Sequence, residues 1–487
     1  MYSQVFINDT SLIRRYTELS DLQKHRTYPK RLFAKLKTTE SHIIMSSKKN
    51  QEKSIPRTRL GRLGRIARMA GGVAAGMIGE GAKQLSQGKR PKVSDLLLTP
   101  SNARKVANQL ATMRGAAMKV GQLLSMETSD FLPPELAEIL AQLRNRAFIM
   151  PRNQLLDSLV KAYGDDWQSK FKHFEFEPLA AASIGQVHRA TTLDGEDIVL
   201  KIQYPGVAKS IDSDVDNIAT LFRVTKILPK HMDITDLLRD AKLQLHEEAN
   251  YLQEAEYMEA FRSALADQKN YIIPKYYPEL STERILAMDF VSGEPIESLA
   301  ELDPALVDKL MTAMFELTFK ELFELRLMQT DANFANYLFQ HDTHKIALLD
   351  FGASRRFSKR FAIDYKRLLR AVEANDSIAI IVAADKLGYQ ASEASEEYQE
   401  FLVAVFTIAL EPFSKPGLYD FKAGLLSDRL SQLSQDGYSF KEFWQTPPTD
   451  ILYLHRKLGG MFMLATRLGA RVNTHALARP YLEKLAL

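Results

Sequence analysis

Four short segments that carry charged or amide side chains constrain this 487-residue chain more than any other feature. Lys201 stands in IVLKIQY (198–204), an apolar run that predicts a half-buried strand, where an ammonium group needs an anion beside it. The predicted helix HEEANYLQEAEYM (246–258) carries Glu247, Glu248 and Glu254, which can supply such an anion. Asp331 and Asn336 follow in QTDANFANYLF, and Asp350 follows in ALLDFG. Their order and spacing indicate a site for nucleotide phosphates and a metal ion.

The segment ahead of Lys201 departs from the usual nucleotide-binding pattern. D-x4-N followed by D-F-G is the spacing of a kinase catalytic loop and its metal-binding segment. A protein kinase also has a glycine-rich loop upstream of its strand lysine, but this chain has PLAAASIGQVHRA (178–190) at that place. Alanine stiffens such a loop and adds methyl groups near the phosphates. The pattern therefore predicts that the loop contacts the nucleotide phosphates differently, and it disfavours ordinary protein phosphorylation.

The remaining pattern predicts an α+β chain with two lobes. Strand-like runs at 198–204 and 284–290 flank a long helical stretch at 207–266, and a mostly helical half follows Gly293. Within that half, 336–339 and 345–352 predict one short hairpin. The predicted parts are a disordered basic tail (1–56), a basic Gly/Ala-rich membrane-contacting segment (57–92), a helical extension (93–165), an N-lobe (166–293) and a helical C-lobe (294–487).

Charge is distributed unevenly along the chain. Residues 1–92 hold 20 Lys and Arg against 6 Asp and Glu, and the rest holds 44 against 54. A basic N-terminal arm (1–92) attached to an acidic remainder suggests that the arm binds an anionic partner, either a membrane or nucleic acid. Alternatively, the arm is a solvated tail. The arm lacks the interleaved aromatic residues of a nucleic-acid binder, so we expect no nucleic acid. The absence of cysteine excludes disulfides, thiolate metal sites and a cysteine nucleophile, and it fits a reducing compartment.

The segment 57–82 is the expected place of membrane contact. Arg59, Arg62, Arg65 and Arg68 recur every third residue before an uncharged Gly/Ala-rich run, which has two small-xxx-small pairs that would allow a homodimer. The chain has no apolar run of 18 residues. We therefore expect a peripheral segment lying on an anionic, cardiolipin-like membrane, or alternatively a flexible linker. This predicts a cytoplasmic protein, peripheral at the inner membrane if bacterial. Met45 is an alternative start.

Taken together, the motifs resemble the UbiB family of atypical kinases, and most of all its mitochondrial coenzyme Q kinase-like branch, over about 57–487. The segments that carry the resemblance are MKVGQLLS, PLAAASIGQVH, VLKIQYPGV, EEANYLQEA, MQTDANFANYLF, ALLDFGASR and LHRKLGGMF (454–462). The resemblance implies a bilobal protein-kinase-like fold with an N-terminal helical extension. It also implies a magnesium-dependent ATPase that supports ubiquinone biosynthesis and meets pathway lipids or enzymes at a membrane. The residues leave open a lipid or small-molecule kinase and a nucleotide-gated scaffold.

The same resemblance assigns roles to individual residues. It implies that Lys119 pairs with Glu248, that Lys201 pairs with Glu254, and that Asp331 is the catalytic acid or base. Asn336 and Asp350 would hold Mg²⁺, and the hinge at Asp289 and Val291 would meet the adenine. The implied nucleotide-binding residues of the alanine-rich loop are Ala180, Ala181, Ala182, Ser183, Gly185 and Gln186. The implied regulatory residues are Lys119, Gly121 and Gln122 of a K-x-G-Q motif, with Glu248 and Asn250.

The chain departs from the family at a few positions. Asn250 stands where the family has Asp in its E-x-D motif, and a neutral amide is a weaker metal ligand than a carboxylate. His188 and His246 are interpreted as hydrogen-bonded structural residues rather than ligands or bases. The C-terminal cations are interpreted as either a surface face or partners of the extension: Arg456, Lys457, Arg467 and Arg471.

Overall fold

The structure is a computed structural model that describes residues 115–117, 119–121, 149–225, 234–299, 302–331, 333–436 and 448–483. All of these residues except 149–151 belong to one compact unit. The predicted tail (1–56) and membrane-contacting segment (57–92) lie outside the described residues, as does Gln122. The predicted domain boundaries stay predictions.

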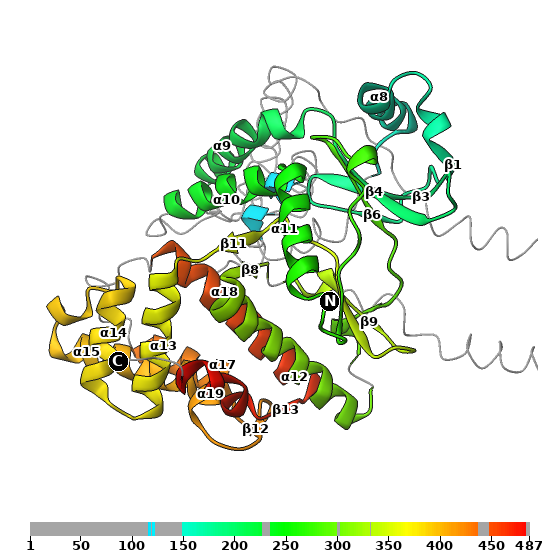
Figure 1. The fold of residues 1–487 in the computed structure, drawn as a ribbon. Coiled ribbons are helices and arrows are strands. Elements are labelled where there is room, and N and C mark those ends of the chain that lie inside the picture. The colour runs from blue at the N-terminus through cyan, green and yellow to red at the C-terminus, as the bar shows by residue number, and fades with distance from the viewer. Residues whose placement is uncertain are drawn as a thin grey trace, which may run out of the picture. The chain divides into compact units, whose positions relative to one another are not determined.

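A five-stranded antiparallel sheet forms the first part of the fold (Figure 1). Its strands run in the order β1 (Phe171–Phe174), β3 (Gly185–Thr192), β4 (Asp197–Gln203), β6 (Ile285–Asp289), with β2 (Ala180–Ala181) pairing with β3. After Asp197 every residue of β4 is buried, as expected for a central apolar strand. Lys201 therefore stands in a dry position, opposite Val187 of β3 and Leu286 of β6.

Three helices, rather than one continuous stretch, connect β4 to β5 (Tyr271–Ile272). They are α9 (Val207–Thr225), α10 (Thr235–Glu248) and α11 (Tyr251–Ala264). The helical pattern breaks between α10 and α11 because Asn250 is the N-cap of α11, and its side chain accepts a hydrogen bond from the Gln253 amide at 3.2 Å. The break places Glu248 and Glu254 on two different helices, each with its own partner.

A second antiparallel hairpin follows, as the sequence predicted. Strands β9 (Tyr337–Gln340) and β10 (Lys345–Leu348) pair directly and extend into a four-stranded sheet with β5 and β7 (Glu294–Pro295). Strand β8 (Leu327–Gln329) pairs separately with β11 (Ser354–Arg356), so that Gln329 lies opposite Ser354. These two pairings bring together the loop that follows β8 and the D-F-G segment that precedes β11.

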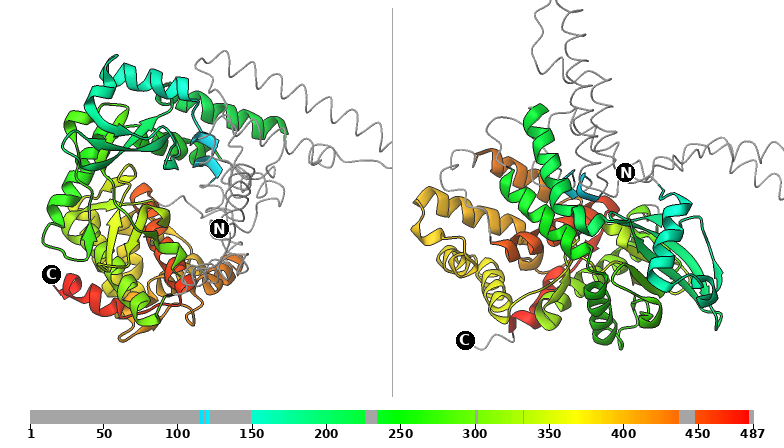
Figure 2. Two further views of the ribbon diagram at one scale, coloured as in Figure 1. Left: turned by 90° about the vertical axis from the view of Figure 1, so that its right-hand side faces the viewer. Right: turned by 90° about the horizontal axis from the view of Figure 1, so that it is seen from above.

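The remainder is mostly helical, with one short antiparallel pair of β12 (Tyr419–Asp420) and β13 (Arg471–Val472), and has its own core. It comprises α12 (Pro304–Lys320), η5 (Glu321–Leu325), α13 (Lys359–Glu373), α14 (Ser377–Leu387), α15 (Glu396–Ala409), α16 (Glu411–Ser414), α17 (Leu426–Asp436), α18 (Thr449–Leu468) and α19 (Thr474–Glu483). Rings of Phe315, Phe413, Phe421 and Phe462 join α12, α16 and α18, with the Phe315 and Phe421 centroids 5.2 Å apart. Figure 2 shows α13 to α19, coloured yellow to red, gathered apart from strands β1 and β3 in cyan to green. None of the helices in the described part of the chain combines the length and hydrophobicity needed to span a bilayer.

Candidate active site

The strand lysine lies in a buried ionic cluster. Lys201 Nζ donates to Glu254 Oε1 and Oε2 at 2.8 and 3.0 Å and to Asp350 Oδ2 at 3.2 Å. Burial alone would lower the pKa of Lys201, but the two carboxylates outweigh it and raise that pKa well above its usual value. Burial raises the pKa of Glu254 to about 7, although Lys201 acts against it. The structure thus forms the predicted Lys201–Glu254 pair and adds Asp350 to it.

Asp350 and Asn336 carry oxygen atoms of the kind that Mg²⁺ prefers as ligands. Asp350 Oδ1 accepts the Gly352 amide at 2.9 Å, and its side chain is 35% exposed. The carbonyl of Asn336 accepts the Leu349 amide at 3.0 Å, which places Asn336 beside the D-F-G segment. No group of three His, Asp or Glu side chains that could hold a metal occurs among the residues described. An ion would therefore draw on Asp350, the Asn336 amide oxygen, phosphate and water, a set that Mg²⁺ accepts.

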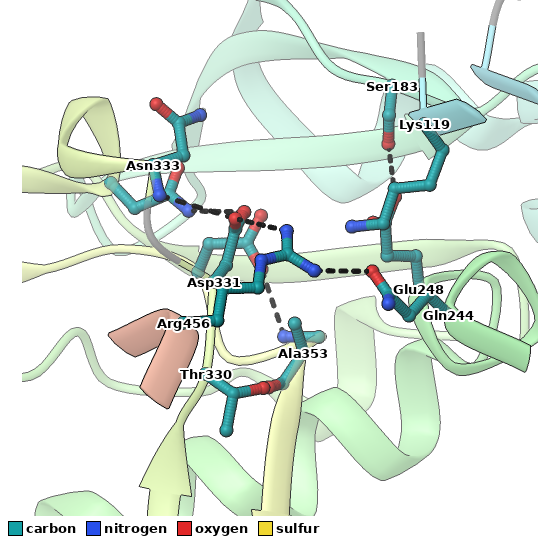
Figure 3. A network of polar contacts seen from close by, with 12 residues as sticks. Lys119, Ser183, Gln244, Glu248, Thr330, Asp331, Asn333, Ala353 and Arg456 are labelled. Carbon is teal, nitrogen blue, oxygen red and sulfur yellow. Dashed lines mark hydrogen bonds and ion pairs between the residues drawn. The ribbon is translucent and has the colours of Figure 1, made fainter. Parts of the chain in front are cut away.

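The catalytic loop, residues 330–336, holds Asp331 from several sides. Asp331 accepts the Asn333 amide at 3.2 Å and the Asn336 side-chain amide at 3.4 Å. Thr330 donates through its amide and its hydroxyl to the Ala353 carbonyl, at 3.0 and 2.6 Å, which ties the loop to the D-F-G segment. Figure 3 shows these contacts around Asp331. The structure therefore brings together Lys201, Asp331, Asn336 and Asp350, as the sequence predicted.

The alanine-rich loop is a tight hairpin. Ala180 and Ala181 pair with β3, and the Ala182 amide donates to the Gly185 carbonyl at 2.9 Å, leaving Ser183 and Ile184 at the tip. Only glycine fits at position 185, because a Cβ atom there would lie 2.3 Å from the Ile202 carbonyl oxygen. The Gln186 side chain is buried against the His188 ring at 2.6 Å. Its amide is therefore engaged within the sheet.

The extension contacts this hairpin directly. Residues 115–117 and 119–121 are helical, and a Cβ atom on Gly115 would lie 2.8 Å from both the Ser183 carbonyl and the Ile184 side chain. Lys119 Nζ donates to Glu248 Oε1 at 2.6 Å, as the resemblance implied, and Ser183 Oγ donates to Glu248 Oε2 at 2.5 Å. One carboxylate thus joins the extension to the tip of the loop (Figure 3). Gly121 lies on the same helical segment.

The predicted hinge residues lie at the end of β6. The Asp289 amide donates to the Lys275 carbonyl at 3.0 Å, and its carboxylate accepts the Tyr277 hydroxyl at 2.8 Å. Val291 is half-buried two residues further on. The Asp289 side chain is therefore engaged by protein, which leaves the backbone after it as the candidate for adenine contact.

Sequence reasoning missed two residues of the site. Arg456 and Lys457 of α18 are only 8% and 1% exposed in their side chains, so the expected surface face is wrong for them. Arg456 lies 3.7 Å from Asp331 Oδ1 and donates to Gln244 of α10 at 3.1 Å, and Lys457 contacts the ends of the catalytic loop. The burial of Lys457 could have been predicted from helical spacing, which places it on one face of α18 with Leu454, Leu458 and Met461.

His188 and His246 contact protein groups, in agreement with their interpretation as hydrogen-bonded structural residues. His188 Nδ1 lies 2.9 Å from the Glu175 carbonyl, its ring stacks on Phe174, and burial lowers its pKa. His246 lies 3.2 Å from Asp212 on an exposed surface.

Comparison with known proteins identifies the family. The ABC1 atypical kinase-like domain matches residues 142–383. The atypical kinase COQ8 of Saccharomyces cerevisiae is 36% identical over 423 residues, covering 86% of this chain and 84% of the yeast protein. The atypical kinase COQ8B of Rattus norvegicus is 34% identical over 428 residues, covering 88% and 81%. The chain belongs to the ABC1, or UbiB, family of atypical kinases.

One solved structure supports the fold of this atypical kinase. Rv3197 of Mycobacterium tuberculosis, solved in complex with erythromycin, aligns with a TM-score of 0.55 at 24% identity. The alignment covers 78% of this chain and 96% of that protein. At that identity the likeness concerns the fold alone, and it agrees with the kinase-like arrangement of the sheet, the catalytic loop and the helices.

The unusual Asn250 of this atypical kinase leads to a prediction. Because its side chain caps α11, Asn250→Asp should leave the free energy of unfolding within ~0.5 kcal/mol of the native value, since Asp caps a helix as well as Asn. Asn250→Ala, the matched control, should lower stability by ~1 kcal/mol. Urea unfolding followed by circular dichroism measures both. Equal stability in all three proteins would mean that the cap contributes nothing.

Proposed function

We propose that this chain is a magnesium-dependent ATPase of the atypical kinase family, which acts at an anionic membrane surface in support of ubiquinone biosynthesis. The observation that carries the proposal is the complete set of phosphoryl-transfer groups around one site. Lys201 lies within 3.2 Å of both Glu254 and Asp350, and Asp331 and Asn336 share a hydrogen bond on the adjacent loop. Such a set positions phosphates and stabilises the charge that develops on them.

The chain's own residues have distinct tasks in this proposal. Lys201, held by Glu254, would bind phosphate oxygens, and Asp331 would accept a proton from the attacking water or hydroxyl group. Asn336 and Asp350 would hold Mg²⁺, which neutralises phosphate charge when bound. The backbone of the alanine-rich hairpin would cover the phosphates from the sheet side.

Hydrolysis is favoured over protein phosphorylation by the position of the extension. Lys119 and Gly115 contact Glu248 and the hairpin tip, beside the site that a peptide substrate would have to approach. The relatives named as mitochondrial COQ8 atypical kinases support a role in coenzyme Q synthesis. Anionic lipids would meet the basic segment 57–92, which begins with the series Arg59, Arg62, Arg65 and Arg68.

Phosphate release from ATP and Mg²⁺ tests the proposal. We expect release by the full chain to rise with liposomes that contain an anionic lipid such as cardiolipin, and to fall ~10³-fold in Asp350→Asn. Neutral phosphatidylcholine liposomes are the matched lipid control. An exposed aspartate in the turn after β9, Asp342→Asn, is the matched protein control.

Each alternative outcome has a defined meaning. Binding of nucleotide without release under either lipid condition would contradict the ATPase proposal and favour a nucleotide-gated scaffold. Transfer of labelled phosphate to a lipid or small molecule would favour a kinase instead. Equal release with anionic and neutral liposomes would contradict the membrane part alone.

A further inference from the structure

A buried polar cluster beneath the catalytic loop has no task in the function proposed above. It consists of Lys457 of α18, Gln329 at the end of β8, Tyr337 at the start of β9 and Glu321 at the start of η5. Each of the four is 1% exposed or less. Removing an ammonium group and a carboxylate from water is unfavourable unless their surroundings compensate.

The contacts of Lys457 join the two ends of the catalytic loop. Its Nζ donates to the Tyr337 hydroxyl at 2.5 Å and to Gln329 Oε1 at 3.2 Å. The Tyr337 hydroxyl in turn donates to Gln329 Oε1 at 2.8 Å. Gln329 is the residue immediately before the loop, and Tyr337 is the residue immediately after it. The three side chains therefore form a closed triangle across the base of the loop that carries Asp331 and Asn336.

Glu321 fixes the same end of the loop through the backbone. Its Oε1 accepts the Gln329 amide at 3.3 Å, while its Oε2 lies 4.0 Å from Lys457 Nζ. Within the described part of the chain, Glu321 Oε2 and Gln329 Nε2 have no hydrogen-bond partner. Burial lowers the pKa of Lys457 and raises that of Glu321 to about 7. The cluster is thus poorly compensated electrostatically, which argues for a geometric role rather than for added stability.

We propose that Lys457 is a positioning residue, which closes the base of the catalytic loop and so fixes the separation of Asp331 and Asn336. It acts through Gln329 and Tyr337 and touches no reacting atom itself. The consequence for turnover rests on the proposed function, whereas the consequence for the geometry of the loop does not.

Amide hydrogen exchange of the nucleotide-free full chain tests the geometry directly. The backbone amides of Thr330, Asn333 and Asn336 donate hydrogen bonds in the folded loop. Exchange of a peptide spanning 330–336 therefore reports on whether the loop is folded. Lys457→Met should speed exchange of that peptide ~10-fold or more, while a peptide from β4 exchanges as in the native protein. Met461→Ala is the matched control: it opens a cavity one turn further along the buried face of α18 but leaves the triangle intact.

Kinetics with ATP provide the second measurement. Lys457→Met should lower kcat ~10–100-fold and leave the KM for ATP within ~3-fold, because the Lys201 contacts persist while the loop is displaced. Tyr337→Phe should give a smaller fall, and the double variant should be no worse than Lys457→Met alone, as expected for residues in one network. Met461→Ala should keep the native kcat at a temperature at which it is folded.

The outcomes separate the two proposals. Native loop exchange and native kcat in folded Lys457→Met would overturn the positioning role. Exchange that rises equally in the loop and in β4 would also overturn it, because the residue would then be merely structural. If the native protein shows no turnover, the proposed function fails, and exchange alone still decides the role of Lys457. If Lys457→Met does not fold, Tyr337→Phe, which removes only one hydroxyl, carries the same comparison.

Discussion

Replacing Asp331 by Asn should slow phosphate release ~10³-fold, within the range that a positioned general base contributes. The substitution preserves the size of the side chain, and the remaining amide oxygen can still accept the Asn333 amide that Asp331 accepts at 3.2 Å. It removes the proton acceptor and the negative charge that lies 3.7 Å from Arg456. Nucleotide affinity should stay within ~3-fold, because Lys201 and Asp350 are unchanged.

Single-turnover phosphate release and the Kd for ADP, measured on the same preparations, separate these effects. Asp342→Asn removes one negative charge from an exposed turn and should leave both quantities unchanged. A native rate in Asp331→Asn would remove Asp331 from the chemistry. An equal loss of rate and affinity would instead assign it to nucleotide binding.

Lys201→Met should lower both nucleotide affinity and stability. The substitution leaves the Glu254 carboxylate, 1% exposed, without its ammonium partner, and breaking a buried pair in this way costs about 3–5 kcal/mol. The loss should depend on pH. Burial already raises the pKa of Glu254 to about 7, and without Lys201, which lowers it, that pKa rises further.

The sign of this pH dependence follows from proton linkage. A carboxyl group whose pKa is higher in the folded than in the unfolded chain binds a proton more tightly in the folded state. The associated stability is full below the unfolded pKa and is lost as pH rises through the folded pKa. Lys201→Met should therefore be destabilised less at pH 6 than at pH 8, as measured by urea unfolding.

The matched control is the double variant Lys201→Met with Glu254→Gln, which removes the uncompensated charge. It should recover much of the lost stability and should lose the pH dependence of the single variant, but it should not recover nucleotide binding. Equal destabilisation at both pH values, with no recovery in the double variant, would mean that Glu254 is not the source of the loss.

Local pattern predicted the elements that carry the acidic and amide groups of the site. The apolar runs around Lys201 and Asp350 form β4 and β10, and the spacing of Asp331 and Asn336 corresponds to a loop closed by their mutual hydrogen bond. These features depend on residues close in sequence or on strand periodicity, which a single sequence displays. The resemblance supplied the long-range pairs Lys119–Glu248 and Lys201–Glu254, which spacing alone leaves undetermined.

The contribution of α18 could not be predicted in the same way. Lys457 meets Tyr337 and Gln329 across 120 and 128 residues, and Arg456 meets Gln244 across 212. Such contacts depend on how helices pack, and helical periodicity only places Lys457 on the buried face without naming its partner. The division of 207–266 into three helices was missed for a related reason, since Asn250 resembles an interior polar residue until its capping contact is seen.

The position of α18 also bears on how late truncations should be interpreted genetically. A premature stop after α17 would leave every acidic group of the site in the translated product, yet remove both cations that meet the catalytic loop. Asp331 and Glu321 would then lose the ammonium group of Lys457, which interacts electrostatically with both carboxylates. We expect such an allele to lose catalysis even in a product that escapes degradation, and we expect no fragment lacking α18 to restore function in a complementation assay.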